Sequence, residues 1–307
     1  MYLKPRKPST DPRLRSLLQK AVRRGSVPIV ERVGARLDSI GDSTWLRSRT
    51  VVITFEECWP LAGSLLSVDR ALSSKIGALT GIARSAKQKD AAGLGALAHA
   101  HREGDSSVLA LVPDRRALRI VAEALGRPDE FFRWALSDVE SKDGTDIIRA
   151  AQRYLTVATW DWDKACILAG ALLATTGPVP NPTPISLAQT AEGFPYWTAL
   201  DKHTDEGKVV LRDVAKSMKV KYRQLIWASF YCESARVNEL LPSPWFAAER
   251  TWRLARAKLT YEAGQELWSR ASVLVRDRLA SDAETLKRLV ESELPTRVAP
   301  QHTMRLG

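Results

Sequence analysis

Segments with the apolar spacing of an α-helix recur along the whole chain, and most have a capping residue before them and Gly or Pro after them. The first is typical: Asp11-Pro12 supplies an N-cap with Pro at the first helical position, and Gly25 ends the apolar stripe. Residues 50–55 are the one strongly β-branched run, and a lone strand has no partner with which to pair. The sequence therefore predicts an all-α fold, an irregular multi-helix bundle of helical hairpins.

A cluster of four prolines within seven residues, at positions 178 to 184, makes the strongest break in this pattern, because proline favours extended backbone and donates no hydrogen bond. We therefore place a Pro-rich linker at residues 178–186. It separates an N-terminal helical domain, residues 1–177, which begins with a basic helix, from a C-terminal helical domain, residues 187–294. Residues 295–307 lose the periodicity and are predicted to be a disordered tail. A HEAT-like solenoid is the alternative, but the irregular helix and loop lengths favour a compact bundle.

The charge of the chain is unevenly distributed. The 46 Lys and Arg residues exceed the 35 Asp and Glu residues by 11. Residues 1–24 hold eight basic residues against one acid, a net charge of seven, which indicates a polyanionic partner. The eight are Lys4, Arg6, Lys7, Arg13, Arg15, Lys20, Arg23 and Arg24.

The cysteines and the apolar runs indicate the compartment. Three cysteines, with no CxxC pair among them, are typical of a reducing environment. No apolar run approaches the 18 residues that a membrane span needs, and the first residues lack the apolar stretch of a secretory signal. We therefore expect a cytoplasmic protein that does not contact membranes.

Known catalytic motifs are missing from the sequence. It contains no G-x-x-x-x-G-K-[ST] loop for nucleotide phosphates, no H-E-x-x-H, no Cys and His set at zinc spacing, and no G-x-S-x-G. We therefore expect no catalytic residue, no metal site and no cofactor, although catalytic residues can also meet from distant parts of a chain.

The first of three unusual stretches is residues 18–25. Lys20, Arg23 and Arg24 lie at helical spacing on one face, opposite the apolar stripe. Such a face can contact nucleic-acid phosphates. The simpler interpretation, which charge alone favours, is a solvated helix end where cations relieve the macrodipole.

The second stretch, residues 45–60, contains Arg47 and Arg49 followed by the adjacent acids Glu56 and Glu57. Neighbouring side chains in a helix diverge by about 100°, so both acids are not expected to serve one catalytic centre. We instead expect one of them to pair with an arginine such as Arg47 or Arg49. Cys58 and Trp59 follow, and Cys58 is interpreted as a buried small hydrophobic residue.

The third stretch, residues 197–208, lies where a loop meets a helix N-terminus. Lys202, His203 and Lys208, with exposed amides, would bind an anion there. Equally, Thr204 would cap the helix while Asp201 or His203 satisfies backbone groups. The ten tryptophans of the chain, Trp160 and Trp162 among them, are interpreted as packing residues rather than platforms for bases.

Together, residues 18–25 (LQKAVRRG), 45–57 (WLRSRTVVITFEE) and 199–208 (ALDKHTDEGK) resemble the C-terminal helical region of RarA/MgsA-type replication-associated AAA+ ATPases, especially its stand-alone phage and mobile-element relatives. The resemblance implies an all-helical, clamp-loader-collar-like fold that oligomerises beside DNA, and it implies that residues 50–55 are helical. The family's ATPase module has no counterpart in these 307 residues. Trp59 replaces a glycine common in relatives, so any close approach of backbone at that glycine is not expected here.

Three functional hypotheses follow. The leading one is a non-enzymatic, DNA-associated protein of replication, repair or mobile-element maintenance that binds the nucleic-acid backbone without sequence specificity. The second is an assembly module that oligomerises or docks a separately encoded ATPase or sliding-clamp component. The third is a nucleic-acid-processing enzyme in which Glu56, Glu57, Asp201 and His203 share a cleft. The residues predicted to contact DNA are Lys4, Arg6, Lys7, Lys20, Arg23, Arg24, Arg47, Arg49, Lys202, His203 and Lys208, and those with a structural role in the motifs are Glu56, Glu57, Trp59, Asp201 and Thr204.

Overall fold

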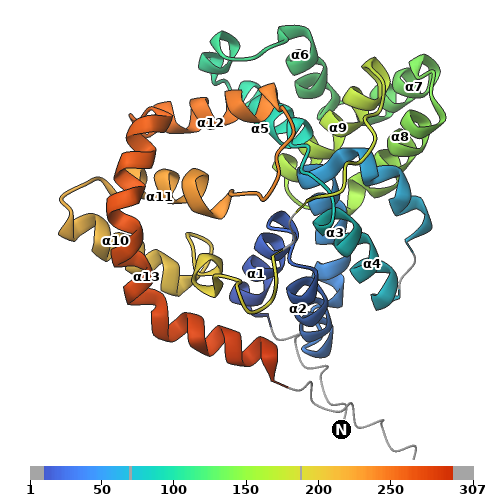
Figure 1. Cartoon of the computed structure of the whole chain (residues 1–307). Helices are drawn as coiled ribbons and strands as arrows, with labels where there is room; N and C mark the ends of the chain where they lie inside the picture. Colours follow the sequence, from blue (N-terminus) through green and yellow to red (C-terminus); the bar gives the residue numbers. More distant parts are fainter. Residues whose placement is uncertain (1–9, 69–70, 187–188, 293–307) are drawn as a thin grey trace, which may run out of the picture.

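The computed structural model describes residues 10–68, 71–186 and 189–292 (Figure 1). Within these ranges the chain forms thirteen α-helices and no strands, which confirms the predicted all-α fold. None of the helices in these ranges is both long and apolar enough to cross a membrane. Lys4, Arg6, Lys7 and the tail predicted at 295–307 lie outside the described residues.

Most helices follow one another closely, several joined through 3₁₀-helix, whereas the long segment 177–204 joins α9 to α10. The first nine are α1 (Pro12–Arg23), α2 (Val27–Ser39), α3 (Ser43–Cys58), α4 (Leu72–Ala83), α5 (Asp90–Arg102), α6 (Arg115–Ala124), α7 (Pro128–Asp138), α8 (Lys142–Tyr154) and α9 (Asp161–Thr176). The last four are α10 (Asp205–Ser217), α11 (Tyr222–Ser229), α12 (Pro244–Arg256) and α13 (Tyr261–Glu291). In Figure 1, α10 to α13 occupy the left of the molecule and α1 lies between them and α3.

Helix α3 contains the β-branched run and is helical throughout, as predicted. The hydroxyl of Thr50 donates to the carbonyl of Leu46 at 2.7 Å, and that of Thr54 donates to the carbonyl of Thr50 at 2.8 Å. Both threonines are therefore satisfied within the helix, which lets them lie buried. Burial on nearly all sides of residues 50–55 outweighs their modest preference for strands.

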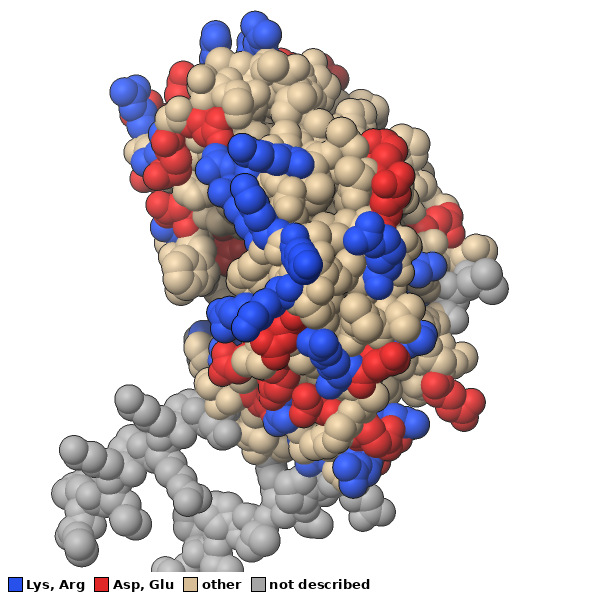
Figure 2. Space-filling model, turned by 90° about the vertical axis from the view of Figure 1, so that its left-hand side faces the viewer, with Lys and Arg blue, Asp and Glu red and all other residues tan. Residues whose placement is uncertain are grey.

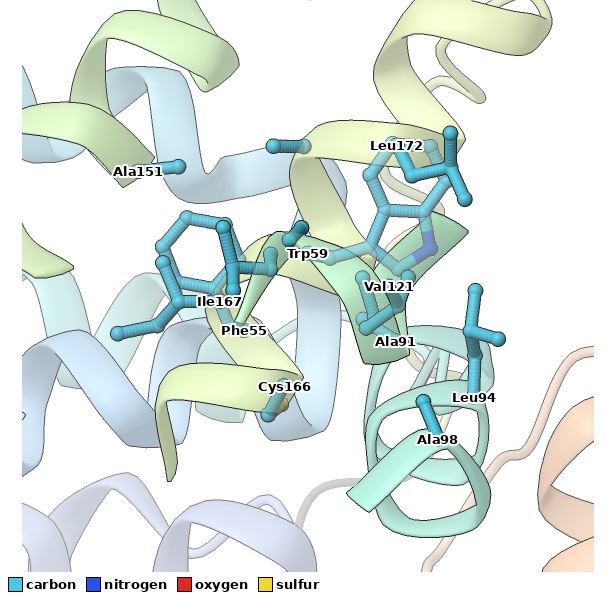
Figure 3. Packing of buried hydrophobic residues seen from close by; sticks show 14 of the residues in the cluster. Phe55, Trp59, Ala91, Leu94, Ala98, Val121, Ala151, Cys166, Ile167 and Leu172 are labelled. Atoms are coloured by element: carbon cyan, nitrogen blue, oxygen red, sulfur yellow. The ribbon is translucent and has the colours of Figure 1, made fainter. Parts of the chain in front are cut away.

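One hydrophobic core is built around α5, α8 and α9, with Phe55 and Trp59 from the end of α3 and the turn that follows (Figure 3). Glycines allow its helices to approach closely. A Cβ on Gly95 of α5 would lie 2.5 Å from the backbone nitrogen of Cys166 on α9. A Cβ on Gly170 of α9 would lie 2.5 Å from the Phe55 ring. The close approach of α5 to α9, and of α9 to Phe55, therefore depends on glycine at these two positions.

A second core combines distant parts of the sequence. Side chains of α1 to α4 pack there with side chains of α10, α11 and α13. Leu17 and Val33 from the first group share this core with Leu211, Leu225 and Leu279 from the second. The Pro-rich segment 178–186 thus joins stretches that contribute to one core, and the division into two domains at this segment stays a prediction.

A short buried segment, residues 85–88, forms isolated β-bridges and connects three other segments. The amide of Ala86 donates to Thr183 at 2.7 Å, that of Lys87 to Glu239 at 2.8 Å and that of Gln88 to Glu57 at 2.8 Å, in each case to the carbonyl oxygen. The ammonium of Lys87 donates to carbonyls at the end of α4, and its burial lowers its pKa to about 8. A buried lysine therefore caps α4 in place of solvent.

The turns α10–α11 and α12–α13 share one geometry. Lys219 and Lys258, 39 positions apart, are the two non-glycine residues with positive φ in the described ranges, at 57° and 60°. In each turn the amide after the lysine donates to the carbonyl five residues earlier at 3.0 Å, the Schellman arrangement. Tyr222 and Tyr261 begin the following helices. These two turns are therefore structurally equivalent, although no repeat is evident in the sequence.

Candidate functional site

The basic face of α1 is buried, not exposed. The exposed fractions of Lys20, Arg23 and Arg24 are 3%, 7% and 5%. We expected these side chains to lie on an open face, whether solvated or in contact with phosphate, and that expectation is wrong. Because α1 packs between α2 and the segment that precedes α10, carboxylates from distant parts of the chain meet the three cations.

Lys20 connects α1 to the third sequence motif. Its ammonium lies 2.5 Å from a carboxylate oxygen of Asp201, and the other oxygen accepts from the backbone amide and contacts the ring of His203, both at 2.9 Å. Burial alone would raise the pKa of Asp201, but Lys20 and His203 hold it well below its usual range. Thr204 accepts from the amide of Gly207 at 3.2 Å, so its predicted capping role is confirmed.

Glu57 is held between two cations at the centre of the molecule. Its carboxylate accepts from Arg23 at 2.7 Å and from Lys89 at 2.9 Å, and only 1% of the residue is exposed. Burial opposes ionisation, but Arg23 and Lys89 outweigh it and lower the pKa of Glu57 to about 2. Arg24 is paired in the same way with Glu233 at 2.6 Å.

The side chain of Glu56, next to Glu57 in the sequence, has different partners from that of Glu57. It pairs with Arg49 at 3.0 Å, and Arg49 also contacts Asp163 at 3.1 Å. The prediction that one of the two acids pairs with a nearby arginine is therefore confirmed. Arg47 lies exposed on another side of α3, beside a separate cavity. Trp59 is packed in the first core.

The three motifs meet at a cavity of about 680 Å³, which we call the motif pocket. It is enclosed by α1, α3, the start of α9, the loop before α10, α11 and α12. Its aromatic side chains are Trp45, Trp160, Trp162, Trp227 and Phe230. Its basic side chains are Arg15, Lys20, Arg23, Arg49, Lys202, His203 and Arg253, and its acidic ones are Glu56, Asp163 and Glu249. Aromatic and charged side chains therefore line the pocket together.

Lys202 differs from the other strong cations of the pocket. Among the residues that the structure describes, no carboxylate lies within 4.0 Å of its ammonium. The ammonium instead lies 3.9 Å from the ring centre of Trp227 and 4.1 Å from that of Phe230, within cation–π distance. Burial lowers the pKa of Lys202 to about 8, so most of it is charged at neutral pH. Its charge is available to an anion in the pocket.

Two arginines of the pocket also make cation–π contacts with its tryptophans. The guanidinium of Arg253 lies 4.4 Å from the ring centre of Trp162 and 5.0 Å from that of Trp227. Arg15 lies 4.8 Å from the ring centre of Trp45 and pairs with Asp42 at 2.6 Å.

Trp160 marks the rim of the pocket. Its exposed fraction is 72%, which leaves an open indole face beside the charged interior. The expectation that this residue packs into the protein is wrong. The N-cap position of α9 turns its side chain outward, whereas Trp162, two residues on, is half-buried against the ring of His99.

The remaining predicted site residues lie at different depths. Of the four proposed for a composite acidic centre, Glu56 and His203 line the motif pocket, whereas Glu57 and Asp201 are not among its lining residues and are paired beneath it. Lys208 lies outside the pocket and pairs with Asp205 at 3.1 Å. Within the described ranges, no three His, Cys, Asp or Glu side chains are grouped to hold a metal ion.

Several pocket residues were not singled out from the sequence. They are Asp163, Trp227, Phe230, Glu249 and Arg253. Each lies on a helix outside the three motifs, and no local pattern identifies it, because only the fold brings these helices together. The density of tryptophans was the one available signal.

Comparison with known proteins gives no further guidance: no family model, curated protein or solved structure matches the chain.

Proposed function

We propose that the chain is a non-enzymatic nucleic-acid-binding protein that holds a stretch of single-stranded DNA in the motif pocket. The observation that carries this proposal is the meeting of three sequence motifs at one cavity with aromatic walls and a cation that has no acid partner among the described residues. Its volume lies within the range of pockets for small organic ligands.

The aromatic walls support binding of bases. Stacking of a base on an aromatic side chain contributes about 1–3 kcal/mol and tolerates any sequence, since every base has a π-face. The open indole of Trp160 offers such a face at the rim, and Trp45 and Trp162 lie deeper. Affinity without sequence preference is therefore expected.

The charges support binding of the phosphates that accompany those bases. Lys202 supplies a positive charge inside the pocket, and Arg253 lies between two of its rings. The buried pair Lys20–Asp201 holds the backbone from which Lys202 projects. In this proposal Lys20, Arg23 and Arg24 position the pocket rather than neutralise phosphates.

The basic N-terminus belongs to the same proposal. Lys4, Arg6 and Lys7 lie outside the described residues, but they lead into Pro12 and Arg15, which line the pocket. They would add contacts to phosphates beside the bound strand. The association with DNA replication, repair or mobile-element maintenance, with a separately encoded ATPase, rests on the family resemblance.

The test is equilibrium binding of a fluorescein-labelled oligothymidylate, read by anisotropy and by quenching of tryptophan fluorescence. Trp160→Ala should weaken binding by about 5-fold or more, because it removes a stacking platform while the fold, to which this side chain contributes little, persists. Trp160→Phe should restore most of the affinity. Lys202→Gln should weaken binding and lower the salt slope by about 0.7, the value for one phosphate of a single strand.

Lys142→Gln is the matched control for Lys202→Gln, because Lys142 is exposed on α8 away from the pocket. It should leave both affinity and salt slope close to wild type. Equal affinity of the wild type and Trp160→Ala, with no tryptophan quenching at saturation, would show that the pocket does not hold the strand.

A further inference from the structure

The corner between α10 and α11 carries a dense and uncompensated positive charge. Lys216, Lys219, Lys221 and Arg223 are exposed, and the eight residues 216–223 contain no acid. Among the described residues, no carboxylate lies within 4.0 Å of these four charges. Figure 2 shows Lys and Arg side chains gathered in a band across the face formed by the helices on the left of Figure 1.

The local fold does not explain two of these four residues, Lys221 and Arg223. Lys219, with a φ of 57°, is not one of them, because its counterpart in the α12–α13 turn is also a lysine, Lys258, with a φ of 60°. Lys221 is the N-cap of α11, where Ser, Thr, Asp or Asn is preferred, because an ammonium cannot accept from the helix amides; only the Gln224 side chain caps this end, accepting from the Lys221 amide at 3.4 Å. Arg223 lies in the first turn, where the helix dipole favours an acid. Basic residues at these positions lower the stability of the corner.

The equivalent α12–α13 turn shows which residue types the same turn geometry can contain. The counterpart of Lys221 is Thr260, whose hydroxyl accepts from the amide of Ala263 at 3.2 Å. The counterpart of Arg223 is Glu262, an acid in the first turn of α13. The turn therefore does not require cations at these two positions, and the charge of the α10–α11 corner calls for another explanation.

We propose that this corner, residues 216–223, binds the phosphate backbone of double-stranded nucleic acid as a second contact, separate from the motif pocket. The choice of nucleic acid as the polyanion rests on the proposed function. The corner has charge but no free aromatic platform, because the half-buried ring of Tyr222 lies 5.4 Å from the guanidinium of Arg212. It therefore suits a duplex, which presents phosphates and keeps its bases stacked inside.

The decisive variant gives the corner the residues of its counterpart turn, Lys221→Thr with Arg223→Glu. Because these residues suit the N-terminus of a helix, we expect the midpoint of thermal unfolding to rise by about 2–4 °C. Binding of a blunt-ended duplex should weaken more than 10-fold at about 0.1 M salt, and the salt slope should fall by about 2, one unit per lost phosphate contact. Loss of binding by a more stable protein cannot be attributed to unfolding.

The matched control is Arg119→Thr with Arg133→Glu, which changes the net charge equally at exposed positions of α6 and α7. Its duplex affinity and salt slope should stay close to wild type. Oligothymidylate binding, followed by tryptophan quenching, should be nearly unchanged in both double variants, because the motif pocket is intact. Nonspecific attraction of the duplex by net charge would instead weaken binding in both double variants alike, which would overturn the proposal.

The two proposals fail separately. If the wild type binds oligothymidylate but not the duplex, or if the corner variant keeps the wild-type salt slope on the duplex, the corner is not a backbone site and the pocket proposal stands. If neither probe binds the wild type, the proposed function and the corner site are both wrong.

Discussion

The buried carboxylate of Glu57 offers the sharpest test of how the centre of the molecule is held together. Glu57→Gln keeps the shape of the side chain and removes its charge. Arg23 and Lys89, both buried, then lose their common counter-ion. Uncompensated buried cations are costly, and among the described residues no carboxylate other than Glu57 lies within 4.0 Å of either cation.

The size of the effect follows from the ionisation of Glu57. Its pKa is lowered from 4.5 to about 2 in the folded protein, and this difference corresponds to about 3 kcal/mol of stability at pH 7. Breaking a buried ion pair by removing one partner costs about 3–5 kcal/mol in proteins generally. We therefore expect Glu57→Gln to lower the free energy of unfolding by about 3–5 kcal/mol, a large part of the 5–15 kcal/mol typical of a folded domain.

The measurement is urea unfolding followed by circular dichroism at pH 7, with Glu56→Gln as the control. Glu56 is the adjacent residue, but its side chain is 17% exposed and its partner Arg49 keeps Asp163. The control should therefore lose only about 1 kcal/mol. Equal losses for the two variants, or a loss below about 1 kcal/mol for Glu57→Gln, would refute the argument that the Arg23–Glu57–Lys89 group stabilises the fold.

The pH dependence of stability gives an independent check that the pKa of Glu57 is lowered in the folded protein. Because the pKa of Glu57 is lower in the folded state, its contribution is complete above about pH 4.5 and is lost as the pH falls toward 2. The difference in unfolding free energy between wild type and Glu57→Gln should therefore shrink over this interval. A difference that stayed constant down to pH 2 would show that the carboxylate is not held ionised.

Two further predictions concern the cores. Gly95→Ala should lower the free energy of unfolding by about 1–3 kcal/mol in urea, because the new Cβ would lie 2.5 Å from the Cys166 backbone nitrogen. Gly77→Ala is the control and should not destabilise the protein, because a Cβ there would meet open space. Cys58 and Cys166 should resist a thiol reagent at pH 7.5 until the protein is unfolded, because burial raises the pKa of each thiol, to about 11 for Cys58. Rapid labelling of either in the native protein would contradict their buried placement.

Helices and caps could be predicted from the sequence because their signals are local. The Asp11-Pro12 start of α1, the cap at Thr204 and the helical path of residues 50–55 all follow from neighbours within one or two turns, the last with help from the family resemblance. The motif stretches 18–25 and 199–208 were also recognised as unusual, and the structure brings them to one pocket.

The environment of those residues could not be predicted. The spacing of Lys20, Arg23 and Arg24 correctly places them on one face of α1, but their carboxylate partners lie 34 to 209 positions away. Nothing in a local pattern tells whether such a face meets solvent or another helix. For the same reason the outward turn of Trp160 and the inclusion of Arg253 in the pocket follow only from the packing of α9 and α12.

The buried cations of α1, Lys20, Arg23 and Arg24, also determine when α1 can fold into the protein during synthesis. α1 is made well before its partners, because Asp201 and Glu233 follow Lys20 and Arg24 by 181 and 209 residues. Before Asp201 and Glu233 are made, burial of α1 would leave Lys20 and Arg24 unpaired, which is costly. We therefore expect α1 to stay exposed to solvent until then. The second core therefore closes only after α10, α11 and α13 have been made, and contacts of such long range make that step slow. A chain truncated after α9 should hold α1 in a loose, solvated state.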